Sequence, residues 1–250
     1  MYKGKTVAVV CPAYNEELLI AETINSIPEY IDKIYVVNDS SIDKTAGIVK
    51  SLSNGRLRLI NHEVNKGVGA AISSGYKQVI EDNIDIAVVM AGDHQMDPSY
   101  LPALLAPVIE GKADYTKGDR VIMQKHKQGM TKFRSLGNWM LKWLTKIASG
   151  NYAINDPQDG YTAISRDALK KMDVDSIYPY YGYCNDMIIK LTALKCRIIE
   201  VPRPYTYTND AVSKIRYHCY IPKVSGLLLR AFLSRIKRKC FGSPGVKNSQ

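Results

Sequence analysis

The sequence lacks any long apolar run and any paired-cysteine motif. No stretch approaches the roughly 20 consecutive apolar residues that a membrane-spanning helix needs. The chain passes from Met1–Lys5 directly into the apolar segment Thr6–Val10, so we expect no signal peptide. Its five cysteines are odd in number and form no CxxC pair, which argues against a disulfide framework or a zinc site. We therefore expect reduced thiols and a cytoplasmic protein.

Acidic residues are missing from the C-terminal part of the chain. From Lys214 to Gln250 there are nine Lys or Arg and no Asp or Glu, whereas residues 1–213 hold 25 basic and 24 acidic residues. A nucleic-acid-binding protein more often carries its charge across a folded face, so we expect no nucleic-acid partner. Cations gathered at one end favour an anionic membrane surface. We expect a folded domain over 1–213 and a basic amphipathic tail over 214–250, peripherally associated with the inner face of the membrane.

Strand-like and helix-like segments alternate in the first half of the chain. The strand-like segments are Thr6–Val10, Ile34–Val37, Leu57–Ile60, Ile86–Met90 and Tyr115–Lys117. The helix-like segments between them are Leu18–Ser26, Thr45–Leu52, Val68–Ile80 and Tyr100–Ile109. This order predicts an α/β fold with a mainly parallel sheet covered by helices on both faces.

The second half of the chain is less regular. Helices are expected over Lys132–Ala148, Asp167–Met172 and Asn185–Leu194, and strands over Tyr161–Ser165 and Ile198–Val201. After Pro222, apolar residues and cations separate at helical spacing over Lys223–Arg238, which predicts a basic amphipathic helix. Such a helix either docks on the domain or lies in the headgroup region of a membrane. The absence of acidic residues favours the membrane.

Polar segments follow four of the expected strands. Pro12 is expected to end the first strand and to lead into an acidic helix start. After the second strand, Asp39 is placed to accept a hydrogen bond from a nucleoside base or ribose. After the third, Gly67 permits close approach of the backbone to a ligand and Lys66 can reach a phosphate. No Walker A or GxGxxG motif is present, which argues against a kinase or a dehydrogenase.

The fourth polar segment, Ala91–Pro98, follows the apolar strand Ile86–Met90. Asp93 and Gln95 offer hard oxygen ligands suited to Mg²⁺ or Mn²⁺ carrying a diphosphate. A carboxylate beyond the C-terminal end of a strand lies where open α/β sheets hold their ligands.

Four such segments, in this order, resemble the glycosyltransferases of family 2, which have the GT-A fold. The resemblance runs from about Thr6 to about Tyr207 and is nearest to the dolichol-phosphate mannosyltransferase and polyprenyl-phosphate glycosyltransferase branch. It implies a GT-A domain over 1–213 with a nucleotide-binding sheet. It also implies that Asp93 and Gln95 hold the metal and the sugar diphosphate, and that the donor is bound by Pro12, Ala13, Tyr14, Glu16, Asp39, Lys66, Gly67 and Asp93.

The chain departs from the family pattern at one metal-site position. The usual Asp-x-Asp has its first Asp replaced by Ala91, so one carboxylate ligand is gone. The same resemblance implies that Asp93, Arg120, Arg134 and Asp156 are catalytic residues. It also implies that Arg120 and Arg134 bind the acceptor. Arg suits this role because its fork donates two hydrogen bonds to a phosphate at once.

Two further segments resemble acceptor-side elements of the family. Ser213 and Lys214 resemble a late loop that contacts phosphate, although Ala211 stands where an acidic residue is usual. Asp186 occupies the place of a catalytic base in other family 2 enzymes. A hydroxyl acceptor needs such a base, whereas a lipid phosphate is already anionic. The role of Asp186 therefore distinguishes transfer to a hydroxyl group from transfer to a lipid phosphate.

The sequence predicts an inverting glycosyltransferase that moves a sugar from GDP-mannose or a UDP-hexose to polyprenyl or dolichyl phosphate, with Mg²⁺ or Mn²⁺ as cofactor. One alternative is transfer to a hydroxyl of a glycan or lipid-linked sugar, with Asp186 as base. Further alternatives are a nucleotidyltransferase and a non-catalytic nucleotide-sugar-binding module, which the loss of an Asp at Ala91 keeps open.

Overall fold

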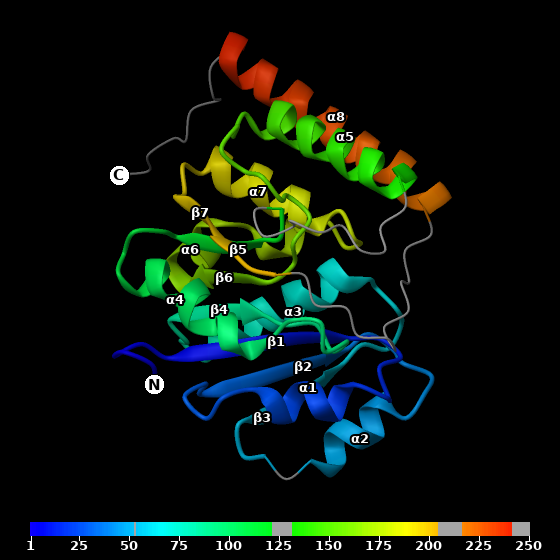
Figure 1. Ribbon diagram of the computed structural model, residues 1–250, viewed down its shortest axis with the longest axis vertical. Helices are drawn as coiled ribbons and strands as arrows, with labels where there is room; N and C mark the ends of the chain where they lie inside the picture. The colour runs from blue at the N-terminus through cyan, green and yellow to red at the C-terminus, as the bar shows by residue number, and fades with distance from the viewer. Residues whose placement is uncertain (53, 122–131, 205–216, 242–250) are drawn as a thin grey trace, which may run out of the picture.

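A seven-stranded sheet forms the centre of the molecule in the computed structural model, which describes residues 1–52, 54–121, 132–204 and 217–241 (Figure 1). The strand order in the described residues is β3-β2-β1-β4-β6-β5-β7. Six strands are parallel, and β6 runs antiparallel between β4 and β5. The strands are β1 (Val7–Ala13), β2 (Lys33–Asn38), β3 (Leu57–Asn61), β4 (Ile86–Val89), β5 (Tyr115–Asp119), β6 (Thr162–Ser165) and β7 (Ile198–Pro202). The predicted α/β fold with a mainly parallel sheet is confirmed.

Helices cover both faces of the sheet. One core lies between the sheet and α1, α2 and α4, and a second lies between the sheet and α3, α6 and α7. Because both faces are buried, β1 is a continuous apolar run: Val7 and Val9 enter the first core, and Ala8 and Val10 enter the second. The α-helices are α1 (Ile20–Ser26), α2 (Thr45–Ser51), α3 (Val68–Glu81), α4 (Leu101–Ile109), α5 (Lys132–Ser149), α6 (Arg166–Lys171), α7 (Tyr183–Ala193) and α8 (Tyr217–Phe241). Short 3₁₀ turns span Pro98–Tyr100 and Val174–Ser176.

Two helices form an outer layer. α5 and α8 lie side by side beyond α7 (Figure 1), and Val224 and Leu228 of α8 pack with Ala148 and Ile189 in a small separate core. The helix expected after Pro222 begins earlier, at Tyr217, and contains Pro222. Pro222 is the sixth residue of α8, so its missing N–H removes one backbone hydrogen bond of the second turn.

The expectation that Pro12 ends the first strand is wrong. β1 continues through Pro12 to Ala13, in parallel register with β2. The Pro12 carbonyl accepts from the Gly92 N–H at 3.1 Å, so the polar backbone groups of Pro12 face the β4 side. Since β4 ends at Val89, the missing N–H removes no ladder hydrogen bond.

The topology places the ends of several parallel strands at one edge. β1 lies between β2 and β4, so the strand order reverses at β1. Open α/β sheets bind their ligands beyond the C-terminal ends of the strands at such a switch point. The segments after β1, β2, β3, β4 and β5 meet at this edge and carry most of the predicted site residues.

Candidate active site

The segments that follow β1 and β2 are joined by hydrogen bonds. The Asn15 N–H donates to Ser41 Oγ at 3.0 Å, and Asn15 Oδ1 accepts from the Ile42 N–H at 2.9 Å. The Glu16 N–H donates to Thr45 Oγ1 at 2.8 Å. Asn15 has a φ of +53°, a conformation that asparagine tolerates better than most residues. These bonds fix the backbone of the segment predicted to hold the donor nucleotide.

Asp39 is buried and holds the segment between β3 and α3. Its Oδ1 accepts from the Lys66 N–H at 2.8 Å, and its Oδ2 accepts from the Gly67 N–H at 2.7 Å. The His62 ring joins Asp39 to α3, with Nδ1 2.7 Å from Asp39 Oδ1 and Nε2 2.9 Å from Ser74 Oγ. Asp39 therefore shapes the loop that carries Lys66, whose side chain is exposed. A nucleoside contact by Asp39 stays a prediction.

The glycines at the start of α3 make room for the 178–180 segment of the chain, and a ligand contact by Gly67 stays a prediction. A Cβ added to Gly67 would lie 2.4 Å from the Pro179 carbonyl oxygen, and one added to Gly69 would lie 2.0 Å from that of Tyr178. The Pro179 carbonyl accepts from the N–H groups of Gly69 and Ala70 at 2.8 and 3.2 Å. It thereby satisfies two of the donors that a helix N-terminus leaves open. The first turn of α3 is capped by the 178–180 segment.

Asp186 holds the 178–180 segment through the backbone of Tyr178. Its carboxylate accepts from the Tyr178 N–H at 2.8 Å and forms an ion pair with Lys190 at 2.5 Å. The residue is 5% exposed and does not line the pocket described below. Its geometry is that of a residue that holds the 178–180 segment against Gly67 and Gly69.

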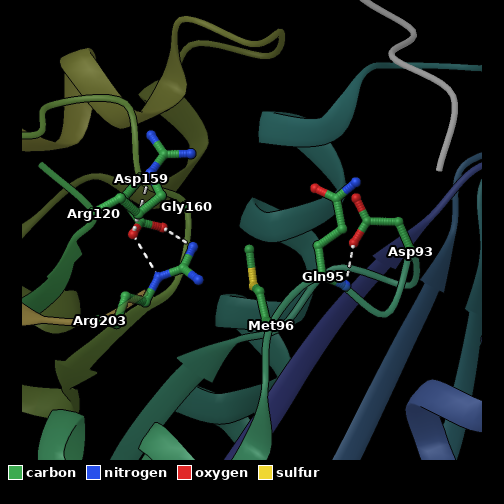
Figure 2. Close-up of a pocket in the computed structure, with 7 residues that line it drawn as sticks. All are labelled: Asp93, Gln95, Met96, Arg120, Asp159, Gly160 and Arg203. Atoms are coloured by element: carbon green, nitrogen blue, oxygen red, sulfur yellow. Dashed lines mark hydrogen bonds and ion pairs between the residues drawn. The ribbon is translucent and has the colours of Figure 1, made fainter. Parts of the chain in front are cut away.

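A small pocket opens at the end of β4 (Figure 2). Asp93 and Gln95 line one side, with the Gln95 N–H donating to Asp93 Oδ1 at 3.2 Å. Met96 separates this side from the opposite wall and accepts from the Ala91 N–H through its sulfur at 3.3 Å. The volume is about 60 Å³, far below the 300–1,000 Å³ typical of sites that enclose a whole small molecule. It has room for a group the size of a phosphate, while a nucleotide would lie outside it.

Two more groups belong to the Asp93 side of the edge. Burial raises the pKa of Tyr181, and the negative charges of Glu16 and Asp93 raise it further. Burial likewise raises the pKa of the Cys11 thiol beneath them, again with help from Asp93 and Glu16. The carboxylates of Glu16 and Asp93 therefore both act on the groups buried at this edge.

The opposite wall is a chain of buried ion pairs. Arg120 donates to both carboxylate oxygens of Asp156, at 2.7 and 2.9 Å, and its Nε lies 3.6 Å from Asp159 Oδ2. Arg203 donates to both oxygens of Asp159, at 2.6 and 2.9 Å (Figure 2). The side chains of Asp156 and Asp159 are 7% and 0% exposed. Burial opposes ionisation of Asp156, but the Arg120 guanidinium outweighs it and holds the pKa of that carboxyl well below its usual range.

The loop that carries Asp156 and Asp159 is held by charged groups from β5 and β7. Glu200 accepts from the Asn155 and Asp156 N–H groups at 2.6 and 2.8 Å, and Lys117 donates to the Asp156 carbonyl. Burial raises the pKa of Glu200. A Cβ at Gly118 would lie 2.3 Å from Asp159 Oδ2 and 2.7 Å from Arg203 Nε. The glycine therefore leaves the space on β5 that this ion pair occupies. The result is a rigid wall that presents Arg120 to the pocket.

Comparison with known proteins decides the family. Residues 8–173 match the sequence profile of glycosyl transferase family 2. The chain belongs to this family. The glycosyltransferase is 31% identical over 225 residues to UDP-N-acetylglucosamine–dolichyl-phosphate N-acetylglucosaminyltransferase of Methanococcus voltae, covering 84% of this chain and 89% of that one. It is 28% identical over 216 residues to undecaprenyl-phosphate mannosyltransferase of Micrococcus luteus, covering 84% and 87%.

The fold of the glycosyltransferase also matches solved structures. Glucosyl-3-phosphoglycerate synthase from Mycobacterium tuberculosis, in complex with Mn²⁺, UDP and phosphoglyceric acid, superposes with a TM-score of 0.69 at 22% identity. The match covers 93% of this chain and 78% of that one. The GT-A fold expected from the sequence is therefore confirmed, and the enzyme is a hexosyltransferase of family 2.

The donor set at Asp93 fits a divalent cation carried by a diphosphate. The described residues contain no cluster of three or more His, Cys, Asp or Glu that could enclose a metal by themselves. Mg²⁺ is commonly bound through one or two carboxylates together with substrate phosphates. Asp93 and the amide oxygen of Gln95, side by side in the pocket wall (Figure 2), match that pattern.

Some predicted residues of the glycosyltransferase are not described. The Arg134 backbone belongs to α5, but its side chain lies outside the described residues, as do Ser213 and Lys214 entirely. Sequence reasoning missed Asp159, Arg203 and Tyr181 as site residues. Asp159 lies three residues after Asp156, which the resemblance already selects, and this proximity is the available signal. Nothing in the sequence points to Arg203, because its partner is 44 residues away.

Proposed function

We propose that this glycosyltransferase moves a sugar, with inversion at the anomeric carbon, from a nucleoside-diphosphate donor to a dolichyl or polyprenyl phosphate. A GDP-mannose or UDP-hexose donor is proposed, with Mg²⁺ or Mn²⁺ as cofactor. The lipid acceptor requires the enzyme to work at a membrane surface, for which we propose the cytoplasmic face.

One observation carries the proposal. A single pocket joins the oxygen ligands Asp93 and Gln95 to the cation Arg120. The first side suits the donor diphosphate, and the second suits an anionic acceptor oxygen, so both partners of the transfer reach the same space. The names of the two relatives, which include dolichyl phosphate and undecaprenyl phosphate, agree with an acceptor of this chemistry.

The chain's own residues then perform orientation and charge stabilisation. Arg120 is aimed by its two hydrogen bonds to Asp156, and the lowered pKa of Asp156 keeps that carboxylate ionised at neutral pH. The fixed guanidinium can align a phosphate oxygen for in-line attack. A divalent cation held by Asp93 and Gln95 would supply Lewis-acid neutralisation of the leaving diphosphate. The attacking oxygen is already anionic, so no base is required.

The geometry of Asp186 disfavours the hydroxyl-acceptor alternative. A general base must lie within hydrogen-bond reach of the proton it removes. Asp186 does not line the pocket, and its carboxylate accepts from the Tyr178 N–H and from Lys190. We propose a positioning role for Asp186. Membership of family 2 argues against the nucleotidyltransferase alternative and against a non-catalytic binding module.

The test is a panel of nucleotide sugars with a polyprenyl phosphate and Mg²⁺ or Mn²⁺, scored by release of nucleoside diphosphate. The anomeric configuration of the product is read by NMR. We expect one donor to dominate and the product to be inverted. Arg120→Ala should lower kcat/KM for acceptor far more than Asp186→Asn, with the surface variant Arg197→Ala as control. An inactive Asp186→Asn beside an active Arg120→Ala would mean a hydroxyl acceptor and would overturn the proposal.

A further inference from the structure

Large apolar side chains are exposed along one face of α5. Trp139, Met140, Trp143, Leu144 and Ile147 are between 41% and 58% exposed. They recur at spacings of three, four and eight residues, which places them on one stripe of the helix. The two indole rings contact each other edge to face, with centroids 6.4 Å apart. A soluble surface rarely gathers side chains of this kind without a partner.

α8, the neighbour of α5, also exposes large apolar side chains. Leu229, Leu233 and Ile236 are 59%, 54% and 39% exposed, and they too lie on one stripe. The buried side of α8 is used differently, because Val224 and Leu228 pack against the neighbouring helices. Since α5 and α8 lie side by side (Figure 1), their exposed stripes belong to one outer layer, which we name the α5–α8 face.

The helices α5 and α8 themselves carry cations and no acids. Exposed or half-buried lysines and arginines alternate with the apolar residues, and the described ones are Lys142, Lys146, Lys223, Arg230, Arg235 and Lys237. Lys146 lies over the Trp143 ring at 5.5 Å. No Asp or Glu occurs between Val121 and Asn155 or after Asp210. Trp at the interface and Lys or Arg beside an apolar stripe are features of segments that lie in the headgroup region of a bilayer.

We propose that the α5–α8 face docks on an anionic lipid bilayer, with Trp139 and Trp143 inserted at the headgroup level. A second copy of the chain is disfavoured because it would bring two surfaces of the same charge together, without an acid on either to pair with the cations. No helix in the described parts of the chain is long and apolar enough to cross a membrane, so the contact would be with the surface. The proposal rests on the proposed lipid acceptor and identifies the side of the enzyme that meets it.

The α5–α8 face is continuous with the catalytic edge. Lys223, an exposed residue of α8, lies over the Tyr180 ring at 4.8 Å. Tyr180 is itself 46% exposed and belongs to the segment that caps α3. Docking through this face would therefore bring the bilayer surface near the segment that borders the donor loop.

The test uses a property of the sequence: its only two tryptophans are Trp139 and Trp143. Tryptophan emission, excited selectively over tyrosine, therefore reports on the α5 part of the α5–α8 face. With vesicles of phosphatidylcholine and phosphatidylglycerol we expect a blue shift, and with brominated lipid we expect quenching. Both should weaken in neutral vesicles and at high salt. Donor and acceptor are absent, so the readout is independent of glycosyl transfer.

Point variants give the matched comparison. Truncation of α8 is unsuitable, because Val224 and Leu228 are 0% and 3% exposed and hold the outer layer together. Each cation near an anionic surface changes partitioning about fivefold, so Lys142→Gln/Lys146→Gln should lower vesicle partitioning by roughly 25-fold. The control Lys170→Gln/Lys171→Gln removes two exposed lysines of α6 and should change it less than twofold.

Three results would overturn the proposal. One is vesicle binding without any change in tryptophan emission. Another is an equal effect of the α5 and α6 lysine pairs. The third is a blue shift that follows protein concentration in the absence of lipid, with a dimer in sedimentation equilibrium, which would assign the face to a second copy. An enzyme that transfers sugar to a short soluble acceptor but fails the vesicle test would retain the proposed function and lose only this inference.

Discussion

Removal of Arg203 should destabilise the protein strongly, because it leaves a buried carboxylate without its main partner. The side chains of Arg203 and Asp159 are 8% and 0% exposed, and they share two hydrogen bonds. Removing one partner of a buried pair costs about 3–5 kcal/mol. Arg120, with its Nε 3.6 Å from Asp159, compensates in part. We therefore expect Arg203→Met to lower the free energy of unfolding by about 3 kcal/mol, the lower end of that range.

Urea denaturation followed by circular dichroism measures the effect. With a denaturant slope of about 2–3 kcal/mol per M, the midpoint should fall by roughly 1–1.5 M. The control is Arg197→Met, which removes an equally bidentate pair with Asp114 on the surface, where Arg197 is 57% exposed. Exposed pairs contribute about 0–1 kcal/mol, so this midpoint should barely move.

A double variant separates the lost pair from lost packing. In Arg203→Met/Asp159→Asn the charge is gone, while the asparagine oxygen can still accept from the Tyr161 N–H, which now donates to Asp159 at 2.9 Å. Most of the lost stability should return. The reasoning is refuted if Arg203→Met costs no more than Arg197→Met, or if adding Asp159→Asn recovers nothing.

Gly69→Ala should lower the free energy of unfolding by about 1–3 kcal/mol, as overpacking does, because the added Cβ would lie 2.0 Å from the Tyr178 carbonyl oxygen. It should also raise the KM for the donor. In thermal melts of both variants, the control Gly47→Ala, in open space on α2, should be neutral or stabilising. Asp93→Asn should abolish most turnover while the melting temperature stays unchanged. A normally active Asp93→Asn variant would show that Asp93 does not belong to the site. Ala91→Asp should tighten metal binding, measured by titration calorimetry with donor present. Asp156→Asn should flatten the acid limb of the stability curve: the folded pKa of Asp156 lies below its ordinary 3.8, so its contribution is present above that pH and lost as pH falls. An unchanged slope in acid titrations would contradict the last expectation.

The strand and helix content was readable from local pattern. Buried strands such as Ile86–Val89 are apolar runs bounded by turn residues, and helices such as Val68–Glu81 carry a helical apolar period, so their sequence signals need no distant partner. Asp93 could be selected because it follows a buried strand, at the edge where open α/β sheets bind ligands, and because the four polar segments occur in the order of the family.

The sequence by itself determined the fold class, because strand and helix signals depend on neighbours within a few residues. The tertiary structure alone decided how the charges pair. Arg120 meets Asp156 and Arg203 meets Asp159 across 36 and 44 residues. It also decided that Gly67 and Gly69 pack against Tyr178 and Pro179, about 110 residues away, because close backbone approach is a property of two segments together. Pairing between residues this far apart cannot be predicted from the local sequence. It is nevertheless required, because burying a charged side chain without a partner costs too much free energy.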